Sequence, residues 1–281
     1  MIARITVLGA GTMGHGIAHA AMLGGFETRL YDVAEPALDK ARAAIEAVIA
    51  KGVERGKVPA SDAKTILGRL TTTDRLEEAL SSTDFVIEAA PERIDLKIDL
   101  FERIEALAPE PAIIATNTSA LSITEMAGSL KNPRRVAGMH FFNPVHKMKL
   151  VEVVQALEST PETIQTITDV AHRMGKETVL VRESPGFITS RVNASIGNEA
   201  FYMLLEGVAS ARDIDKALTL GLNHPMGPFE LVDLVGLDTR LAVLEYLHRS
   251  LGEKYRPCPL LVQYVKAGRL GKKVGRGVYE Y

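Results

Sequence analysis

The sequence predicts an α/β protein in which a doubly wound, mainly parallel sheet is followed by an all-helical domain. Short apolar segments that end in glycine or a polar residue recur through the first 183 residues, and segments with helical spacing separate them. Buried parallel strands are typically continuous apolar runs, and their alternation with helices indicates a doubly wound sheet. From residue 184 onward the strand-like segments stop. We therefore expect two domains, residues 1–183 and residues 184–281.

The N-terminal segment carries the first strand–helix–strand unit. Residues 2–8 form a β-rich apolar run that ends in glycine, and residues 16–23 continue with Ile, Ala and Met at helical spacing. Residues 26–31 are a second apolar run, closed by Asp32. A unit of about 30 residues with this order is a βαβ motif.

The remaining elements follow in the same alternation. Residues 36–70 are charged and helical, and Gly52 and Gly56 interrupt them, so we expect two helices joined by a basic bend. Another helix is predicted at residues 95–107, and a long one at residues 187–209 opens the second domain. Further strands are predicted at residues 85–89, 112–115, 135–139 and 150–154, with residues 178–181 as a candidate edge strand.

Composition excludes several classes of function. Lys and Arg total 33 against 35 Asp and Glu, which is too even a balance for a general nucleic-acid surface. No stretch approaches the ~18 apolar residues that span a membrane. Cys258 is the single cysteine, so an internal disulfide and a cysteine-based metal cluster are excluded. We expect a cytoplasmic protein without a targeting peptide, a membrane partner or a metal.

A glycine-rich motif lies where the first strand meets the first helix. Gly9-Ala-Gly-Thr-Met-Gly14 fits the pattern G-x-G-x-x-G, so Gly9, Gly11, Thr12, Met13 and Gly14 are candidate cofactor-binding residues. Gly9 allows the tight turn, Gly11 lets backbone amides approach a pyrophosphate, and Gly14 lets the helix pack closely on the strand. In this context the motif predicts a Rossmann-type dinucleotide site.

Asp32 ends the second strand and bears on the choice of cofactor. A carboxylate at this position accepts hydrogen bonds from both hydroxyls of the adenosine ribose. It would repel a 2′-phosphate, and no Arg follows directly to receive one. The sequence therefore favours NAD over NADP. Asp32 could also be the N-cap of the following helix, and the two roles are compatible.

Polar residues also follow three of the later strands. They are residues 117–119, His140 with the segment up to residue 144, and Glu152. Ligands of parallel sheets bind at the carboxyl ends of strands. A carboxylate such as Glu152 is costly to bury in an apolar strand without a partner, and an imidazole such as His140 would be a suitable one. Ser119 could contact a substrate oxygen or cap the next helix.

Several motifs resemble those of the L-3-hydroxyacyl-CoA dehydrogenases. They are the glycine motif, Asn117-Thr-Ser-Ala-Leu121, Gly138-Met-His-Phe-Phe-Asn-Pro144, Met148-Lys-Leu-Val-Glu-Val153, Ser184-Pro-Gly-Phe187, Asn198-Glu-Ala200 and His224-Pro-Met-Gly-Pro228. The resemblance covers residues 2–281. The compact length and the C-terminal residues 271–281 look most like the bacterial branch of 3-hydroxybutyryl-CoA dehydrogenases.

The resemblance implies an NAD-dependent oxidation of L-3-hydroxyacyl-CoA to 3-ketoacyl-CoA, and the reverse. His140 would be the general base for the 3-hydroxyl, Glu152 would hold its imidazole, and Ser119 would hydrogen-bond the reacting oxygen and lie near the NAD. The positions implied near NAD also include Glu92, Lys97, Asn143 and Lys273. A homodimer through the C-terminal domain is implied as well.

One position departs from the family pattern. The family usually has Asn before the Arg of its Pro-Gly-Phe-Ile-Val-Asn-Arg stretch, and that Asn helps to hold the substrate oxygen. Here Ser190 precedes Arg191. A hydroxyl still donates one hydrogen bond but is shorter than an amide. Ser190 is therefore either a catalytic residue or a plain helix residue.

The acyl-CoA substrate that the resemblance implies would bring phosphates to the protein. Lys51 and Lys57 in the basic bend are candidates to bind them, and a solvated helix hairpin is the alternative. Two other functions remain open: a dehydrogenase of a free hydroxy acid, and a non-enzymatic relative that kept the fold. The second would be expected to lose the His140–Glu152 pair, which this sequence retains.

Overall fold

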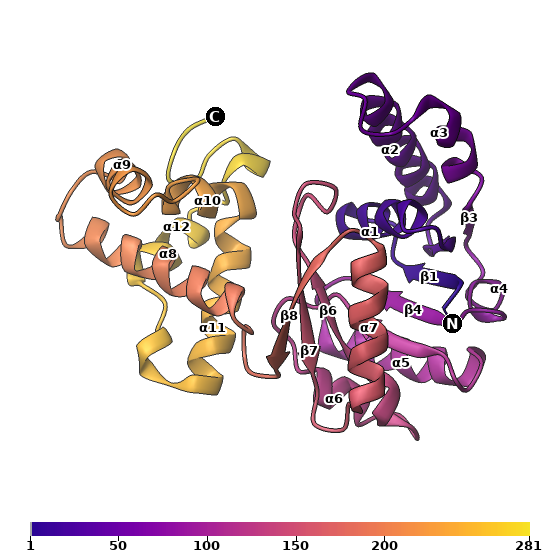
Figure 1. The fold of residues 1–281 in the computed structure, drawn as a ribbon. Coiled ribbons are helices and arrows are strands. Elements are labelled where there is room, and N and C mark those ends of the chain that lie inside the picture. Colours follow the sequence, from indigo (N-terminus) through magenta and orange to yellow (C-terminus); the bar gives the residue numbers. More distant parts are fainter. Residues whose placement is uncertain (1) are drawn as a thin grey trace. The chain divides into compact units, whose positions relative to one another are not determined.

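The computed structural model describes residues 2–281 and divides the chain into two units, Met1–Glu183 and Ser184–Tyr281. The first unit contains one sheet of eight strands in the order β3-β2-β1-β4-β5-β6-β7-β8 (Figure 1). The strands are β1 (Arg4–Leu8), β2 (Glu27–Tyr31), β3 (Leu70–Thr73), β4 (Phe85–Glu88), β5 (Ile113–Thr116), β6 (Val136–Phe141), β7 (Leu150–Gln155) and β8 (Glu177–Arg182). The helices of this unit are α1 (Thr12–Leu23), α2 (Glu35–Glu54), α3 (Ala60–Leu67), α4 (Leu76–Leu80), α5 (Ile94–Leu107), α6 (Ile123–Ala127) and α7 (Pro161–Arg173).

The sheet is parallel from β3 to β6, and its direction then reverses once. β6 and β7 pair antiparallel, while β7 and β8 are parallel again. The prediction of a doubly wound, mainly parallel sheet is confirmed. The order changes direction at β1, which has β2 on one side and β4 on the other. Such a switch point is where doubly wound sheets bind their ligands.

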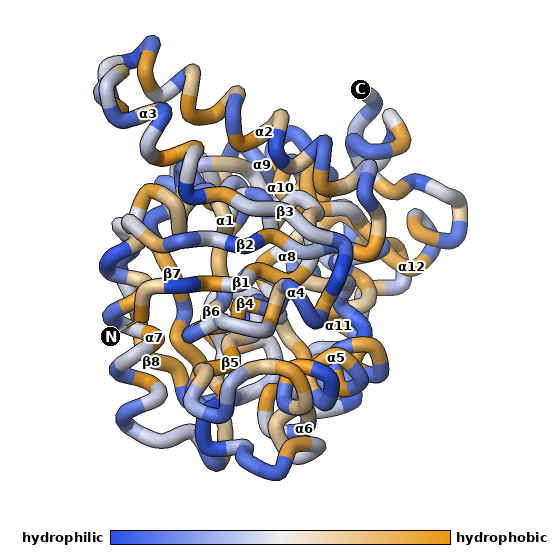
Figure 2. Tube along the Cα trace, turned by 90° about the vertical axis from the view of Figure 1, so that its right-hand side faces the viewer, coloured by the Kyte–Doolittle hydropathy of each residue, from blue (hydrophilic) through white to orange (hydrophobic). Residues whose placement is uncertain are grey.

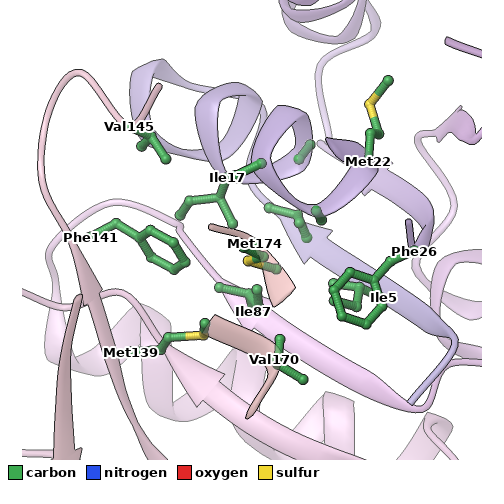
Figure 3. Packing of buried hydrophobic residues seen from close by; sticks show 14 of the residues in the cluster. Ile5, Ile17, Met22, Phe26, Ile87, Met139, Phe141, Val145, Val170 and Met174 are labelled. Atoms are coloured by element: carbon green, nitrogen blue, oxygen red, sulfur yellow. The ribbon is translucent and has the colours of Figure 1, made fainter. Parts of the chain in front are cut away.

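One face of the sheet packs against α1 and α7. Figure 3 shows Ile17 of α1 and Val170 of α7 on either side of Ile87 from β4, and these three residues are fully buried or nearly so. Since side chains alternate along a strand, Met139 and Phe141 of β6 reach this core while His140 points to the opposite face. In Figure 2, hydrophobic and hydrophilic segments alternate along α2, as expected of a helix that covers a core on one side only.

The structure corrects the prediction at β3 and at Gly52, and it adds the helix α7, which was not predicted. The sequence predicts no strand at β3, because Leu70 is the only strongly apolar residue of Leu70–Thr73 and gives no periodic signal. The expectation that Gly52 interrupts the helix is wrong, since α2 continues through it to Glu54. Gly56, with φ of +65°, lies in the break before α3.

The second unit is helical, as predicted. Its helices are α8 (Thr189–Leu205), α9 (Ala211–Gly221), α10 (Pro228–Val235), α11 (Leu237–Leu251) and α12 (Pro259–Lys266). Phe201 of α8 meets Phe229 of α10 edge to face in its core, with ring centroids 5.2 Å apart. None of the helices within residues 2–281 is long and apolar enough to cross a membrane.

Candidate active site

The glycine motif forms a tight turn between β1 and α1. Gly9 has φ of +105°, and its N–H donates to the Tyr31 carbonyl at 2.8 Å. A Cβ on Gly14 would lie 1.7 Å from the Gly9 carbonyl oxygen, so only glycine allows α1 to begin so close to β1. A Cβ on Gly11, in contrast, would meet nothing within 4 Å. The loop therefore has open space beside the N-terminus of α1, where a pyrophosphate can bind.

Asp32 lies beside this turn. Its carboxylate accepts the Ala10 N–H at 2.8 Å and the Ala34 N–H at 3.0 Å. The N-cap of α2 is Ala34, so the expectation that Asp32 is itself the N-cap is wrong, although its carboxylate does bind the Ala34 N–H. These two contacts fix the carboxylate at the edge of the glycine loop. The loop and Asp32 together fit NAD, because they offer backbone amides for phosphates and a carboxylate for ribose hydroxyls.

His140 and Glu152 form a buried pair across two strands. They are directly opposite in the antiparallel register of β6 and β7, and His140 Nδ1 lies 2.7 Å from Glu152 Oε2. Glu152 is 0% exposed and His140 is 6% exposed. Directly opposite residues of an antiparallel pair have neighbouring Cβ atoms, so the reversal of β7 brings the carboxylate to the imidazole. The Phe142 ring lies against His140, with centroids 4.5 Å apart.

Ser119 is held by Glu92. The Ser119 N–H and hydroxyl donate to Glu92 Oε1 at 2.8 Å and 3.1 Å, and the Thr118 hydroxyl donates to the same oxygen at 2.6 Å. This carboxylate fixes the turn that follows β5. Two residues predicted near the cofactor, Ser119 and Glu92, are thus brought into contact with each other.

Lys97 is enclosed beneath this turn and binds a carboxylate that the sequence analysis missed. Its ammonium lies 2.6 Å from Glu88 Oε1 and 3.6 Å from Glu92 Oε2. Glu88 ends β4 and also accepts the Thr116 hydroxyl at 2.6 Å. Glu88 could have been noticed by the same signal as Glu152, because it too is a carboxylate within an apolar strand. The network joins the carboxyl ends of β4 and β5.

The other predicted residues of the first unit lie at its surface. Thr12 is exposed at the start of α1, Asn143 is exposed after β6, and Met13 is half-buried against the core. Lys51 and Lys57 are both exposed, and neither has an ion pair within residues 2–281.

The second unit holds two of the predicted residues. Ser190 is half-buried in the first turn of α8. The Lys273 ammonium donates to both carboxylate oxygens of Asp238 at 2.6 Å. Residues 2–281 contain no group of three or more His, Cys, Asp or Glu side chains that could hold a metal ion.

Comparison with known proteins gives a consistent result for both units. Residues 4–184 match the model of the 3-hydroxyacyl-CoA dehydrogenase NAD-binding domain, and residues 186–281 match that of the C-terminal domain. The chain is 46% identical over its whole length to a probable 3-hydroxybutyryl-CoA dehydrogenase of Bacillus subtilis, covering 98% of that protein. It is 42% identical to a 3-hydroxybutyryl-CoA dehydrogenase of Bradyrhizobium diazoefficiens, and the aligned region covers 100% of this chain and 96% of the relative.

A solved structure is similar over the same length. The (S)-3-hydroxybutyryl-CoA dehydrogenase of Ralstonia eutropha has a TM-score of 0.96 and 40% identity, with 100% of this chain and 99% of that chain covered. These matches confirm the predicted fold, the predicted NAD cofactor and the predicted class of enzyme. The chain belongs to the 3-hydroxyacyl-CoA dehydrogenase family, and it is an NAD-dependent oxidoreductase of 3-hydroxyacyl-CoA.

Proposed function

We propose that this enzyme interconverts L-3-hydroxybutyryl-CoA and acetoacetyl-CoA with NAD. The observation that carries the proposal is the buried His140–Glu152 pair at the carboxyl edge of the sheet, at 2.7 Å. Relatives named 3-hydroxybutyryl-CoA dehydrogenase, at 42% and 46% identity, support the short acyl chain.

In this proposal His140 accepts the proton of the 3-hydroxyl, and bound NAD would supply the acceptor for the hydride at C3. Glu152 engages Nδ1, so the proton is accepted at Nε2, and the carboxylate stabilises the imidazolium that forms. Reduction of the ketone runs the same steps in reverse. The pair thus stores the proton that accompanies each hydride transfer.

Two hydroxyls are proposed to contact the reacting oxygen. Ser119 is presented by the turn after β5, which Glu92 holds through the Ser119 N–H, and its hydroxyl would turn from Glu92 to the reacting oxygen when the substrate binds. Ser190 of α8 would supply the second contact. Neighbouring hydrogen-bond donors stabilise the negative charge that develops on that oxygen during reduction.

The phosphates of coenzyme A are proposed to bind at the basic bend, through Lys51 and Lys57. Both ammonium groups are exposed near the C-terminal end of α2 and the turn that follows. Binding energy from this remote part of the substrate can be used to orient the reacting end. The bend therefore supplies a reason for the enzyme to require the thioester of coenzyme A.

We also propose a homodimer formed through the second unit. Large apolar side chains are exposed there, including Leu220 at 74% and Leu222 at 67%, which would be unusual for a surface that stays in water. Sedimentation velocity should give the mass of two chains at micromolar concentration, and a monomer would contradict the proposal.

A cytoplasmic location remains the prediction from the cysteine content, and cell fractionation tests it.

The proposed substrate is tested by NADH consumption. Acetoacetyl-CoA should give a higher kcat/KM than 3-ketoacyl-CoAs of eight or more carbons, and free acetoacetate should react orders of magnitude more slowly. A preference for the longer thioesters would overturn the short-chain assignment. Comparable values for acetoacetate and acetoacetyl-CoA would indicate an enzyme of free hydroxy acids.

A further inference from the structure

Arg240 is a buried cation without a counter-ion in the second unit. It lies in the first turn of α11 and is 4% exposed. Its guanidinium makes no hydrogen bond or ion pair within residues 2–281, and its Nε is fully enclosed. Burial alone, with no charged neighbour contributing, lowers the pKa of Arg240 to about 10. The side chain is therefore still a cation at pH 7, and none of the roles assigned above uses it.

Such a cation is costly to the fold. A guanidinium that leaves water without an acceptor for its hydrogen bonds destabilises the folded state. Nη1 and Nη2, unlike Nε, are not among the fully enclosed atoms, so an anion from outside the unit can reach them. The planar guanidinium binds a carboxylate through two parallel hydrogen bonds. Arg240 is therefore poised to receive a carboxylate that the rest of the chain does not supply.

Gly197 of α8 leaves the space that the Arg240 side chain occupies. The helices α8 and α11 pack against each other (Figure 1). A Cβ on Gly197 would lie 3.8 Å from Arg240 Nε and 3.9 Å from Arg240 Cδ, so the arginine side chain crosses α8 at this residue. Glycine is unfavourable in the interior of a helix, and its place here is explained by the room that the arginine needs.

Two more polar side chains lie on the same side of α8. Ser190 and Asn193 are half-buried, and neither side chain makes a hydrogen bond within residues 2–281. Helix positions three, four and seven residues apart share one side, so Ser190, Asn193 and Gly197 form a line along α8. With a rise of ~1.5 Å per residue, Ser190 lies about 10 Å from Gly197, where Arg240 crosses the helix.

We propose that Arg240 binds a carboxylate at the far end of the acyl chain, so that 3-hydroxyacyl-CoA thioesters of dicarboxylic acids are substrates as well. The inference rests on the proposed contact of Ser190 with the oxygen at C3. In a six-carbon chain about 5 Å separates that oxygen from a carboxylate at C6. A hydrogen bond of about 2.9 Å at each end then accounts for the distance between Ser190 and Arg240. The amide of Asn193 lies between them and can donate to the same carboxylate.

Two thioesters of equal chain length test this role. 3-Oxoadipyl-CoA ends in a carboxylate at C6, and 3-oxohexanoyl-CoA ends there in a methyl group. In the full-length enzyme with NADH, Arg240→Met should lower kcat/KM at least about tenfold for 3-oxoadipyl-CoA and should not lower it for 3-oxohexanoyl-CoA or acetoacetyl-CoA. Arg240→Lys keeps the charge without the two parallel hydrogen bonds, so it should recover part of the loss. Arg249→Met, at an exposed arginine of the same helix, is the control and should change none of the three values.

The melting temperature separates this role from a structural one. Because the cation is unpaired in the free enzyme, Arg240→Met should keep or raise the melting temperature. A lower melting temperature, or an equal loss of kcat/KM for all three thioesters, would mean that Arg240 is structural. Dissociation of a dimer by Arg240→Met in sedimentation velocity would assign a carboxylate of a second copy to Arg240. Either result, or an unchanged kcat/KM for 3-oxoadipyl-CoA, would overturn the inference.

Ser190→Ala tests the underlying proposed function separately. It should lower kcat equally for all three thioesters, because the oxygen at C3 is common to them. If Ser190→Ala leaves kcat unchanged while Arg240→Met acts on 3-oxoadipyl-CoA alone, the Ser190 contact is wrong and the carboxylate site stands. If Ser190→Ala lowers kcat and Arg240→Met has no selective effect, the inference fails and the proposed function stands.

Discussion

Asp32 is the residue predicted to select NAD over NADP. Its carboxylate is fixed by the Ala10 and Ala34 N–H groups at the edge of the glycine loop. Ribose hydroxyls can donate to it, whereas a 2′-phosphate would be repelled. Asp32→Ala should therefore raise the KM for NADH at least about tenfold and the KM for NADPH much less. Steady-state kinetics with both cofactors check this, and equal efficiency with NADH and NADPH in the unmodified enzyme would contradict it.

At the residue scale, the sequence predicted those site residues whose side chains are polar or charged among apolar neighbours. Glu152 was found because a carboxylate in an apolar strand needs a partner, and His140 is that partner. The burial of His19, whose Nδ1 has no hydrogen-bond partner within residues 2–281, could not be predicted. It is created by α2 and by residues 143–146, which are distant in sequence and meet α1 only in the folded chain.

At the scale of elements, the turn from β1 to α1 contains one glycine that the fold requires, Gly14, and one that we expect cofactor binding to require, Gly11. Gly14→Ala places a Cβ against the Gly9 carbonyl, so it should destabilise the fold by about 1–3 kcal/mol, as overpacking does. Gly11→Ala places its Cβ in open space, so stability should be unchanged while the KM for NADH rises strongly, because the cofactor needs that space. Urea unfolding and NADH kinetics of both variants check the pair. Unchanged NADH binding in Gly11→Ala would contradict the placement of the pyrophosphate.

The ends of β4 and β5 depend on the buried ion pair of Lys97 and Glu88. The two side chains are 1% and 0% exposed. Lys97→Met removes the cation and leaves a buried carboxylate, which should cost about 3–5 kcal/mol of unfolding free energy. Lys97→Met combined with Glu88→Gln should recover most of this loss. Arg93→Ala, which removes an exposed ion pair with Asp95, is the control and should leave urea unfolding nearly unchanged.

The elements that sequence reasoning identified are those with a strong apolar pattern. β4 and β6 are continuous buried runs, and both were predicted. β3 was not, because three of its four residues are threonine. The helix α7 was also missed, although Thr160 caps it through the Thr163 N–H and Pro161 begins it, a combination that a search for helix starts can find.

At the scale of the whole molecule, the proposed reaction depends on two features at the same edge of one sheet. The glycine loop follows β1, and the His140–Glu152 pair lies where β6 ends and the reversed strand β7 begins. In a fully parallel sheet residue 152 would not return to the edge where residue 140 lies. The single antiparallel pairing therefore brings together the two residues proposed as the acid–base pair.

The most direct test of this account is a double-mutant cycle on the pair, with kcat for acetoacetyl-CoA reduction as the readout. His140→Ala should lower kcat ~10²–10⁴-fold, the range for loss of a general acid–base group. Glu152→Gln keeps the shape and removes the charge, so it should cost part of the same amount. If the two residues act as one unit, the double variant is little worse than His140→Ala, and the KM for NADH is unchanged in all three. Losses in kcat that multiply in the double variant would contradict the account.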